Sequence, residues 1–145
     1  MKVLLLHPNF PGQFKHVAAA FARSGHETKF ICQTHYGRKV PGVERITLKN
    51  EYGHDALNLL NLTLVERSQK LGLQFRSGLT ELKRLGWNPD LIISHSGWGC
   101  GLFAKEVWPS TKLCSYLEWW FNPESSFFHH DKDNQLINLN SKSIK

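Results

Sequence analysis

Val3-Leu4-Leu5-Leu6-His7-Pro8-Asn9-Phe10-Pro11-Gly12-Gln13-Phe14 is the stretch that decides the fold class. Its four apolar residues predict a buried strand over 2–6, and the Pro- and Gly-containing turn leads into an amphipathic helix over 12–24. A buried strand, a turn and a helix are the first unit of an open α/β sheet. The loop and the first N–H groups of the helix then point at one spot, which attracts anions and polar ligands.

The rest of the chain continues this alternation of strands and helices. Apolar periodicity and turn residues predict strands over 28–32, 43–48, 91–94 and 112–116, a long helix over 55–85 and a short helix over 99–107. Right-handed connections then give an open parallel Rossmann-like α/β sheet with the strand order 3-2-1-4-5 and helices on both faces. The winding direction reverses between the first and fourth strands, so the loops 7–13 and 95–99 border the crevice where ligands bind in such folds.

Length and composition indicate one domain over 1–121 and a polar tail or linker over 122–145. The chain has 145 residues, of which 41% are hydrophobic, and no apolar run approaches the roughly 20 residues that span a bilayer. Eighteen Lys and Arg against twelve Asp and Glu leave a net charge of +6, which is spread along the chain. This pattern indicates a solvated basic surface, or attraction to phosphorylated or anionic-lipid partners, and no nucleic-acid motif supports DNA or RNA binding.

Cysteine and histidine usage predicts neither a disulfide framework nor a metal site. The three cysteines, Cys32, Cys100 and Cys114, are odd in number and widely spaced, and Cys32 and Cys114 lie in apolar runs typical of buried thiols. His129-His130-Asp131 offers metal-ligand side chains, but adjacent histidines in a polar tail point in different directions. We therefore expect reduced structural thiols, no metal and no cofactor.

The first loop is a candidate ligand site of an unusual type. It has neither the Gly-x-Gly-x-x-Gly pattern of dinucleotide sites nor a Walker pattern. Gly12 would let a phosphate or sugar approach the backbone, Gln13 would donate a hydrogen bond, and Phe10 completes the candidate ligand-binding set of this loop. The alternative is that Pro11-Gly12 only begins the helix.

The second loop, 94–101, contains a histidine at the end of a strand and three glycines around Trp98. Ser96 does not fit a nucleophile elbow, because that turn needs glycine two residues before and two after the serine. His95 is the candidate catalytic residue, and the substrate-binding candidates beside it are Ser96, Gly97, Trp98 and Gly99. The alternative role for His95 is to cap a helix by bonding to the backbone.

Glu118 follows the fifth strand and faces the same edge of the sheet as the two loops. A carboxylate beside the aromatic residues 119–121 can bind sugar hydroxyls or join a domain interface, and it can also be simply solvated. We include Glu118 among the substrate-binding candidates.

These motifs together resemble the N-terminal domain of family-four retaining glycosyltransferases. The match rests on the segments 7–14, 24–27, 89–99 and 116–118, and it is similar to a bacterial subgroup with an Asn-Phe-Pro-Gly-Gln-Phe first loop. The resemblance implies the GT-B architecture, in which two Rossmann-like domains face a cleft. It further implies that Gly12 and Gln13 face the donor phosphates and the acceptor, and that His95 reaches toward the transferred sugar.

The resemblance implies an acceptor-binding domain that needs a partner. The donor-binding domain, with its glutamate pair, would need about 150 further residues, so we expect no transfer by this chain alone. The expected partners are a nucleotide-sugar donor bound through that domain, a sugar or lipid-linked acceptor, and a second copy paired through aromatic residues at 119–121, 127 and 128. The alternatives are a stand-alone sugar- or nucleotide-binding module and a subunit of a split glycosyltransferase. The run of four apolar residues near Met1 is too short for a signal peptide, so we expect a cytoplasmic protein, with a peripheral location at the inner membrane surface as the alternative.

Overall fold

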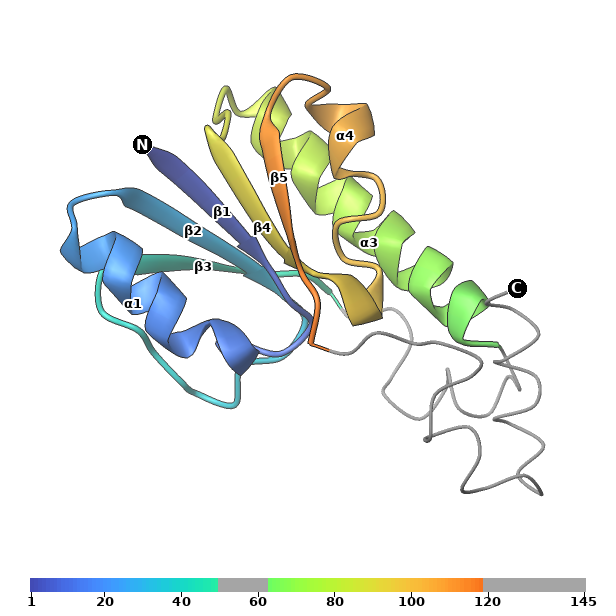
Figure 1. Cartoon of the computed structure of the whole chain (residues 1–145), viewed down its shortest axis with the longest axis horizontal. Coiled ribbons are helices and arrows are strands. Elements are labelled where there is room, and N and C mark those ends of the chain that lie inside the picture. Colours follow the sequence, from blue (N-terminus) through green and yellow to red (C-terminus); the bar gives the residue numbers. More distant parts are fainter. Residues whose placement is uncertain (50–62, 119–145) are drawn as a thin grey trace.

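The computed structural model describes residues 1–49 and 63–118 of the chain. These residues form an α/β domain around one five-stranded sheet in the order β3-β2-β1-β4-β5 (Figure 1). Every neighbouring pair of strands is parallel, which confirms the predicted topology. The strands are β1 (Lys2–Leu6), β2 (Glu27–Cys32), β3 (Val43–Thr47), β4 (Leu91–His95) and β5 (Lys112–Tyr116).

Strand β1 lies at the centre of the sheet because it is apolar on both faces. Its residues 3–6 are completely buried, as expected for a strand covered on both sides in a parallel sheet. Leu5 is in register with Phe30 of β2 on one side and with Ile93 of β4 on the other. The carboxyl ends of β1 and β4 therefore lie next to each other, at the point where the winding direction reverses.

Helices cover both faces of the sheet, as Figure 1 shows. One face carries a short 3₁₀ turn, η1 (Gly12–Phe14), and α1 (Lys15–Arg23). The other face carries α3 (Leu64–Arg84), the 3₁₀ turn η2 (Ser96–Trp98) and α4 (Ala104–Val107). Alternate residues of β1 enter two separate cores, because successive side chains of a strand point to opposite faces. Leu5 packs on the α1 side with Phe14 and Phe30, and Leu4 packs on the α3 side with Phe75.

Helix α3 begins later than the sequence predicts. Its N-cap is Thr63, whose Oγ1 accepts a hydrogen bond from the Glu66 N–H at 3.3 Å, while Glu66 Oε2 accepts one from the Thr63 N–H at 2.8 Å. This capping box fixes Thr63 in an extended conformation, so the prediction of one uninterrupted helix across Thr63 is wrong. Residues 55–62 of the predicted helix lie outside the described residues.

Two other details correct the sequence interpretation. The predicted helix over 99–107 is helical only at Ala104–Val107, because Gly99 has a positive φ of 76° and ends the preceding η2 turn. Cys32 and Cys100 are buried, but Cys114 is exposed on β5, which is the edge strand of the sheet.

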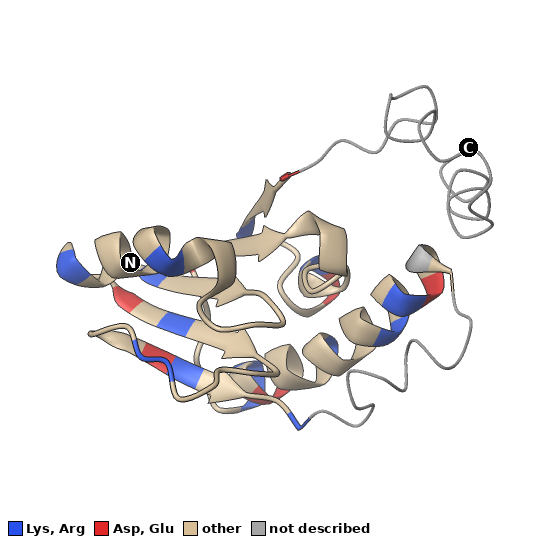
Figure 2. Cartoon of the chain, turned by 90° about the horizontal axis from the view of Figure 1, so that it is seen from below, with Lys and Arg blue, Asp and Glu red and all other residues tan. Residues whose placement is uncertain are grey.

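Charge is dispersed over the described residues. Figure 2 shows Lys and Arg on several helices and strands, interspersed with Asp and Glu. No helix within residues 1–49 and 63–118 is long and apolar enough to cross a bilayer.

Candidate functional site

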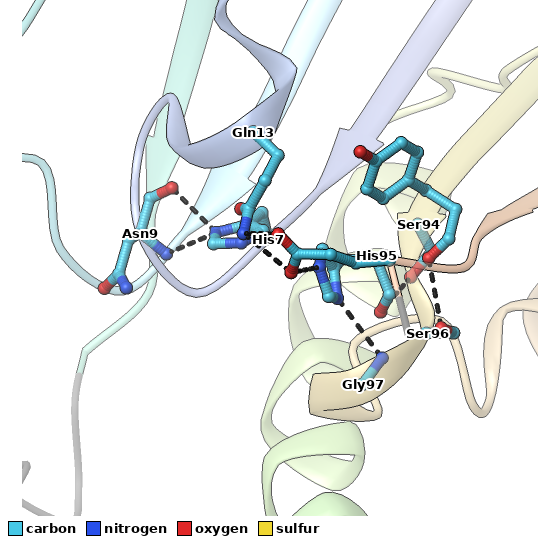
Figure 3. Close-up of polar contacts among 9 residues, drawn as sticks. His7, Asn9, Gln13, Ser94, His95, Ser96 and Gly97 are labelled. Atoms are coloured by element: carbon cyan, nitrogen blue, oxygen red, sulfur yellow. Dashed lines mark hydrogen bonds and ion pairs between the residues drawn. The ribbon is translucent and has the colours of Figure 1, made fainter. Parts of the chain in front are cut away.

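Polar side chains from three separate segments meet at the carboxyl ends of β1, β4 and β5. Gln13 comes from the η1 turn after β1, His95 is the last residue of β4, and Glu118 lies two residues beyond β5. Figure 3 shows this edge of the sheet, with Gln13 and His7 on the β1 side and His95 on the β4 side. The topology predicted that the loops 7–13 and 95–99 lie side by side. The structure brings Gln13 and His95 from these loops together with Glu118.

Glu118 is the centre of the hydrogen-bond network. Gln13 Nε2 lies 3.1 Å from Glu118 Oε2 and 3.3 Å from Oε1, and His95 Nε2 lies 3.1 Å from Oε2. The hydrogen bonds from Gln13 and His95 lower the pKa of the Glu118 carboxyl below its ordinary value. Glu118 is therefore an ionised hydrogen-bond acceptor at neutral pH, and half of its side chain faces solvent.

His95 is held in one orientation and one tautomer. The Gly97 N–H donates to His95 Nδ1 at 3.2 Å, so Nδ1 is the acceptor and Nε2 carries the proton. That N–H donates to Glu118, and only 4% of His95 is exposed. Since both ring nitrogens are engaged, His95 acts as a fixed donor rather than as a free base. The helix-capping alternative is also partly realised, because His95 is the N-cap of η2.

Two exposed aromatic rings flank this network. Trp98 is 47% exposed and Tyr116 is 42% exposed, and their ring centroids lie 6.3 and 5.6 Å from that of His95. Ser96 Oγ donates to the Tyr116 carbonyl at 3.0 Å and ties the second loop to β5. A few fixed polar groups beside apolar rings are typical of a small-molecule site.

His7 belongs to the same cluster, although the sequence analysis did not name it as a site residue. Its ring is perpendicular to that of His95, with centroids 5.2 Å apart, and the residue is only 2% exposed. His7 Nδ1 lies 2.9 Å from the backbone nitrogen of Asn9 and 2.8 Å from its backbone carbonyl oxygen. The sequence signal for His7 was its place as a polar residue directly after the central strand β1. His95 was predicted from the same kind of signal, a histidine at the end of a strand.

Gly12 packs directly on the His7 ring. Its φ is +49°, and a Cβ added at Gly12 would lie 2.7 Å from His7 Cε1 and Nδ1. Gly12 and His95 were predicted to line one pocket, and the structure places both of them against the same imidazole.

Two of the predicted ligand-binding residues lie elsewhere. Phe10 is buried in the core, with its ring centroid 4.9 Å from that of Phe30. Gly99 packs on α3, because a Cβ there would lie 2.3 Å from the Ser68 carbonyl oxygen. Both residues therefore support the loops rather than contribute to the Gln13–His95–Glu118 network.

The described residues contain no group of three His, Cys, Asp or Glu side chains that could hold a metal ion. The segments 119–121 and 129–131, which the sequence analysis considered for dimer formation and for metal binding, lie outside the described residues.

His7 should make the fold less stable as the pH falls below neutrality. Burial is the main cause that lowers the pKa of folded His7, and the nearby His95 lowers it further, although contacts with Asn9, Gln13 and Glu118 partly oppose this. The unfolded chain, with a histidine pKa of about 6.5, therefore takes up the proton first. The contribution of neutral His7 to the free energy of unfolding is therefore complete above a pH of about 6.5. This contribution is lost as the pH falls toward the lower pKa of folded His7.

Urea unfolding from neutral to mildly acidic pH tests this expectation. The unfolding midpoint should fall more steeply with pH in the wild type than in His7→Phe, which keeps a ring but cannot be protonated. His16→Phe is the matched control, because His16 is exposed on α1, and it should retain the wild-type slope. An unchanged slope in His7→Phe would contradict the assignment.

Comparison with known families gives one match over most of the chain. The model of the Glycosyl transferase family 4 group matches residues 24–144. A comparison with curated proteins finds no match.

Two solved structures are similar to this chain at low sequence identity. The structure of TcCGT1 in complex with UDP has a TM-score of 0.54 and 13% identity, and the match covers 92% of this chain and 32% of that one. The C-terminal domain of PF1911 hydrogenase from Pyrococcus furiosus has a TM-score of 0.46 and 18% identity, over 80% of this chain and 90% of that one. The likeness to TcCGT1 concerns the fold, and this chain spans about a third of that protein's length.

Proposed function

The chain belongs to the glycosyl transferase family 4 group, and on this premise we propose that it is the N-terminal, acceptor-binding domain of a nucleotide-sugar-dependent glycosyltransferase. The observation that carries this proposal is the half-exposed Glu118 carboxylate, which is held by Gln13 and by His95, whose own ring lies beside the exposed rings of Trp98 and Tyr116. The nucleotide-sugar is held by a donor-binding domain of the GT-B type, supplied by further residues of a longer chain or by a separate subunit.

The chemistry of the cluster fits the recognition of a hydroxyl group. An ionised carboxylate accepts hydrogen bonds from hydroxyls, and charge-assisted hydrogen bonds of this kind are about twice as strong as neutral ones. The exposed faces of Trp98 and Tyr116 offer apolar surface for the C–H face of a sugar ring. The three groups differ in polarity and lie within one edge of the sheet, which supports a carbohydrate ligand over a purely anionic one.

In this proposal the residues around Glu118 have different roles in binding the substrates and in catalysis. The backbone at Gly12 and the Gln13 amide face the donor phosphates and the acceptor, and Ser96, Gly97 and Trp98 form the wall beside them. His95 is the catalytic residue in this proposal; its Nε2 is hydrogen-bonded to Glu118, and the ring lies at the edge of the sheet where the transferred sugar would sit. Stabilising negative charge on the leaving diphosphate is the main electrostatic task of such a site, and the donor-binding domain shares it.

The proposed setting is the cytoplasm, at the inner membrane surface where the acceptor is lipid-linked. The net charge of +6 supports attraction to anionic lipid headgroups.

Sugar binding by the isolated chain tests the proposal. We expect saturation-transfer NMR with a panel of free monosaccharides to show weak binding that is reduced about tenfold by His95→Ala, because Glu118 loses the partner that positions it and a sugar hydroxyl then loses much of a charge-assisted hydrogen bond that contributes about 1.5–3 kcal/mol. His16→Ala is the control, because it removes an exposed histidine from α1. The same samples should release no nucleotide from nucleotide-sugars.

Two outcomes would overturn the proposal. Binding that is insensitive to His95→Ala would move the sugar site away from this edge of the sheet. Nucleotide release that survives purification and disappears in His95→Ala would show that the chain is a complete catalyst, contrary to its proposed role as one half of an enzyme.

A further inference from the structure

The Nε2 atom of His7 is buried and has no hydrogen-bond partner among the described residues. The residue is 2% exposed and lies between the Gly12 backbone and the rings of His95, Phe14 and Trp98. A buried polar atom without a partner destabilises a fold, so it needs a specific explanation. A ligand that completes the hydrogen bond is such an explanation.

The backbone of Asn9 leaves this nitrogen free to act as donor or as acceptor. Asn9 presents both its N–H and its C=O to His7 Nδ1, at 2.9 and 2.8 Å. If Nδ1 accepts from the N–H, Nε2 carries the proton, and if Nδ1 donates to the C=O, Nε2 has the lone pair. His95 has no such choice, because its Nδ1 faces the Gly97 N–H.

The side chain that borders His7 on the solvent side can move without breaking the fold. Gln13 is exposed, its Nε2 donates to Glu118, and its side chain lies close enough to His7 to act against the lowering of the pKa of that imidazole. Figure 3 shows the Gln13 side chain reaching from its turn toward the His7 ring. Rotation of the Gln13 side chain would make both His7 Nε2 and one lone pair of Glu118 accessible to a ligand.

We propose that His7 is a ligand-binding residue of the site, and that its Nε2 binds a hydroxyl group of a sugar whose neighbouring hydroxyl binds Glu118. A hydroxyl is the group that fits best, because it can donate to an unprotonated nitrogen or accept from a protonated one. An anionic oxygen would fit only one of the two tautomers and would be repelled by Glu118. This inference rests on the proposed function and names the chemical group that the same site recognises.

The first test is spectroscopic and uses the full chain without ligand. Long-range ¹H–¹⁵N correlation of the imidazole rings should show His95 in the Nε2–H tautomer alone and His7 in both neutral tautomers. Assignment comes from the His7→Gln and His95→Gln variants. A single fixed tautomer for His7, with the nitrogen shift of a hydrogen-bonded Nε2, would overturn the proposal.

The second test is titration with the monosaccharides that bind the wild-type chain. Glutamine places its amide where His7 has Nε2, asparagine reaches only the Nδ1 position, and phenylalanine keeps only the ring. We expect His7→Gln to bind within about threefold of the wild type, and His7→Asn and His7→Phe to bind about tenfold more weakly, since one neutral hydrogen bond is lost. Circular dichroism establishes that each variant is folded before its affinity is compared.

Equal affinity in folded His7→Asn, His7→Phe and wild type would show that His7 is only structural, and would overturn the inference. Sugar-induced shifts at His95 and Gln13 but not at His7 Nε2 would also overturn it, while the proposed function would stand. Inorganic phosphate is the competing probe, and a shift of His7 Nε2 by phosphate but by no sugar would overturn the hydroxyl assignment. A panel in which no sugar shifts any of the three residues would count against the proposed function and this inference together.

Discussion

Replacing Gly99 with alanine should destabilise the protein by about 2–5 kcal/mol. A non-glycine residue in the left-handed region costs roughly 1–2 kcal/mol, and Gly99 has a φ of +76°. The added Cβ would also lie 2.3 Å from the Ser68 carbonyl oxygen and 2.8 Å from its carbon. Those atoms are backbone of α3, so relief requires the loop or the helix to shift, at a further cost of about 1–3 kcal/mol.

Gly86→Ala is the matched control for this variant. Gly86 has nearly the same φ, +77°, and a Cβ there would meet no atom within 4 Å. Urea unfolding of the two variants at neutral pH therefore separates backbone strain, which they share, from close packing on α3, which only Gly99 has. Equal losses of unfolding free energy would show that the second loop does not depend on its contact with Ser68.

Gly12→Ala should impair the site more than it impairs the fold. The Cβ would lie 2.7 Å from His7 Cε1 and Nδ1, and these atoms belong to a side chain that can move. We expect a loss of stability of about 2–3 kcal/mol from backbone strain and partial overlap, together with displacement of the His7 ring from His95. The measurements are urea unfolding and the imidazole NMR signals of the two histidines.

Two comparisons isolate the cause. Gly37→Ala has the same kind of strain, since its φ is +71° and no atom lies within 4 Å of the added Cβ, and it should leave both histidine signals unchanged. Adding His7→Ala to Gly12→Ala should remove the overlap, so the double variant should lose less stability than the sum of the two single variants. Strict additivity would refute direct packing of Gly12 on His7.

Much of the fold follows from the sequence because parallel-sheet rules are restrictive. The apolar run of β1, the similar run of β4 and the requirement for right-handed connections leave few alternatives to the observed order. The position of the site follows from the same rules, since Gly12 and Gln13 lie in the connection after β1 and His95 ends β4. The capping box at Thr63 was also present in the sequence, but the apolar periodicity that continues across it concealed the start of α3.

The remaining features depend on contacts that no local pattern specifies. Glu118 contacts Gln13 and His95, which are 105 and 23 positions away in the sequence. Only the assembled sheet determines that these side chains lie close together in space. Phe10 and Gln13 lie in the same short loop, yet one side chain enters the core and the other faces solvent. Cys114 looked buried from its apolar neighbours, but it lies on the edge strand β5, where its side chain is exposed.

The pairing of β1 with β4 makes formation of this domain depend on its late residues. Val3 is in register with Leu91, and the Lys2 N–H donates to Asp90 at 2.7 Å across 88 positions. During synthesis, β1 is therefore made before β4 and waits for this neighbour while the 88 positions from Lys2 to Asp90 are added. Long-range parallel pairing folds slowly and leaves unpaired strand edges open to aggregation. A nascent chain that stalls before Leu91 exposes one edge of β1, and such a fragment is the species that chaperones would be expected to hold.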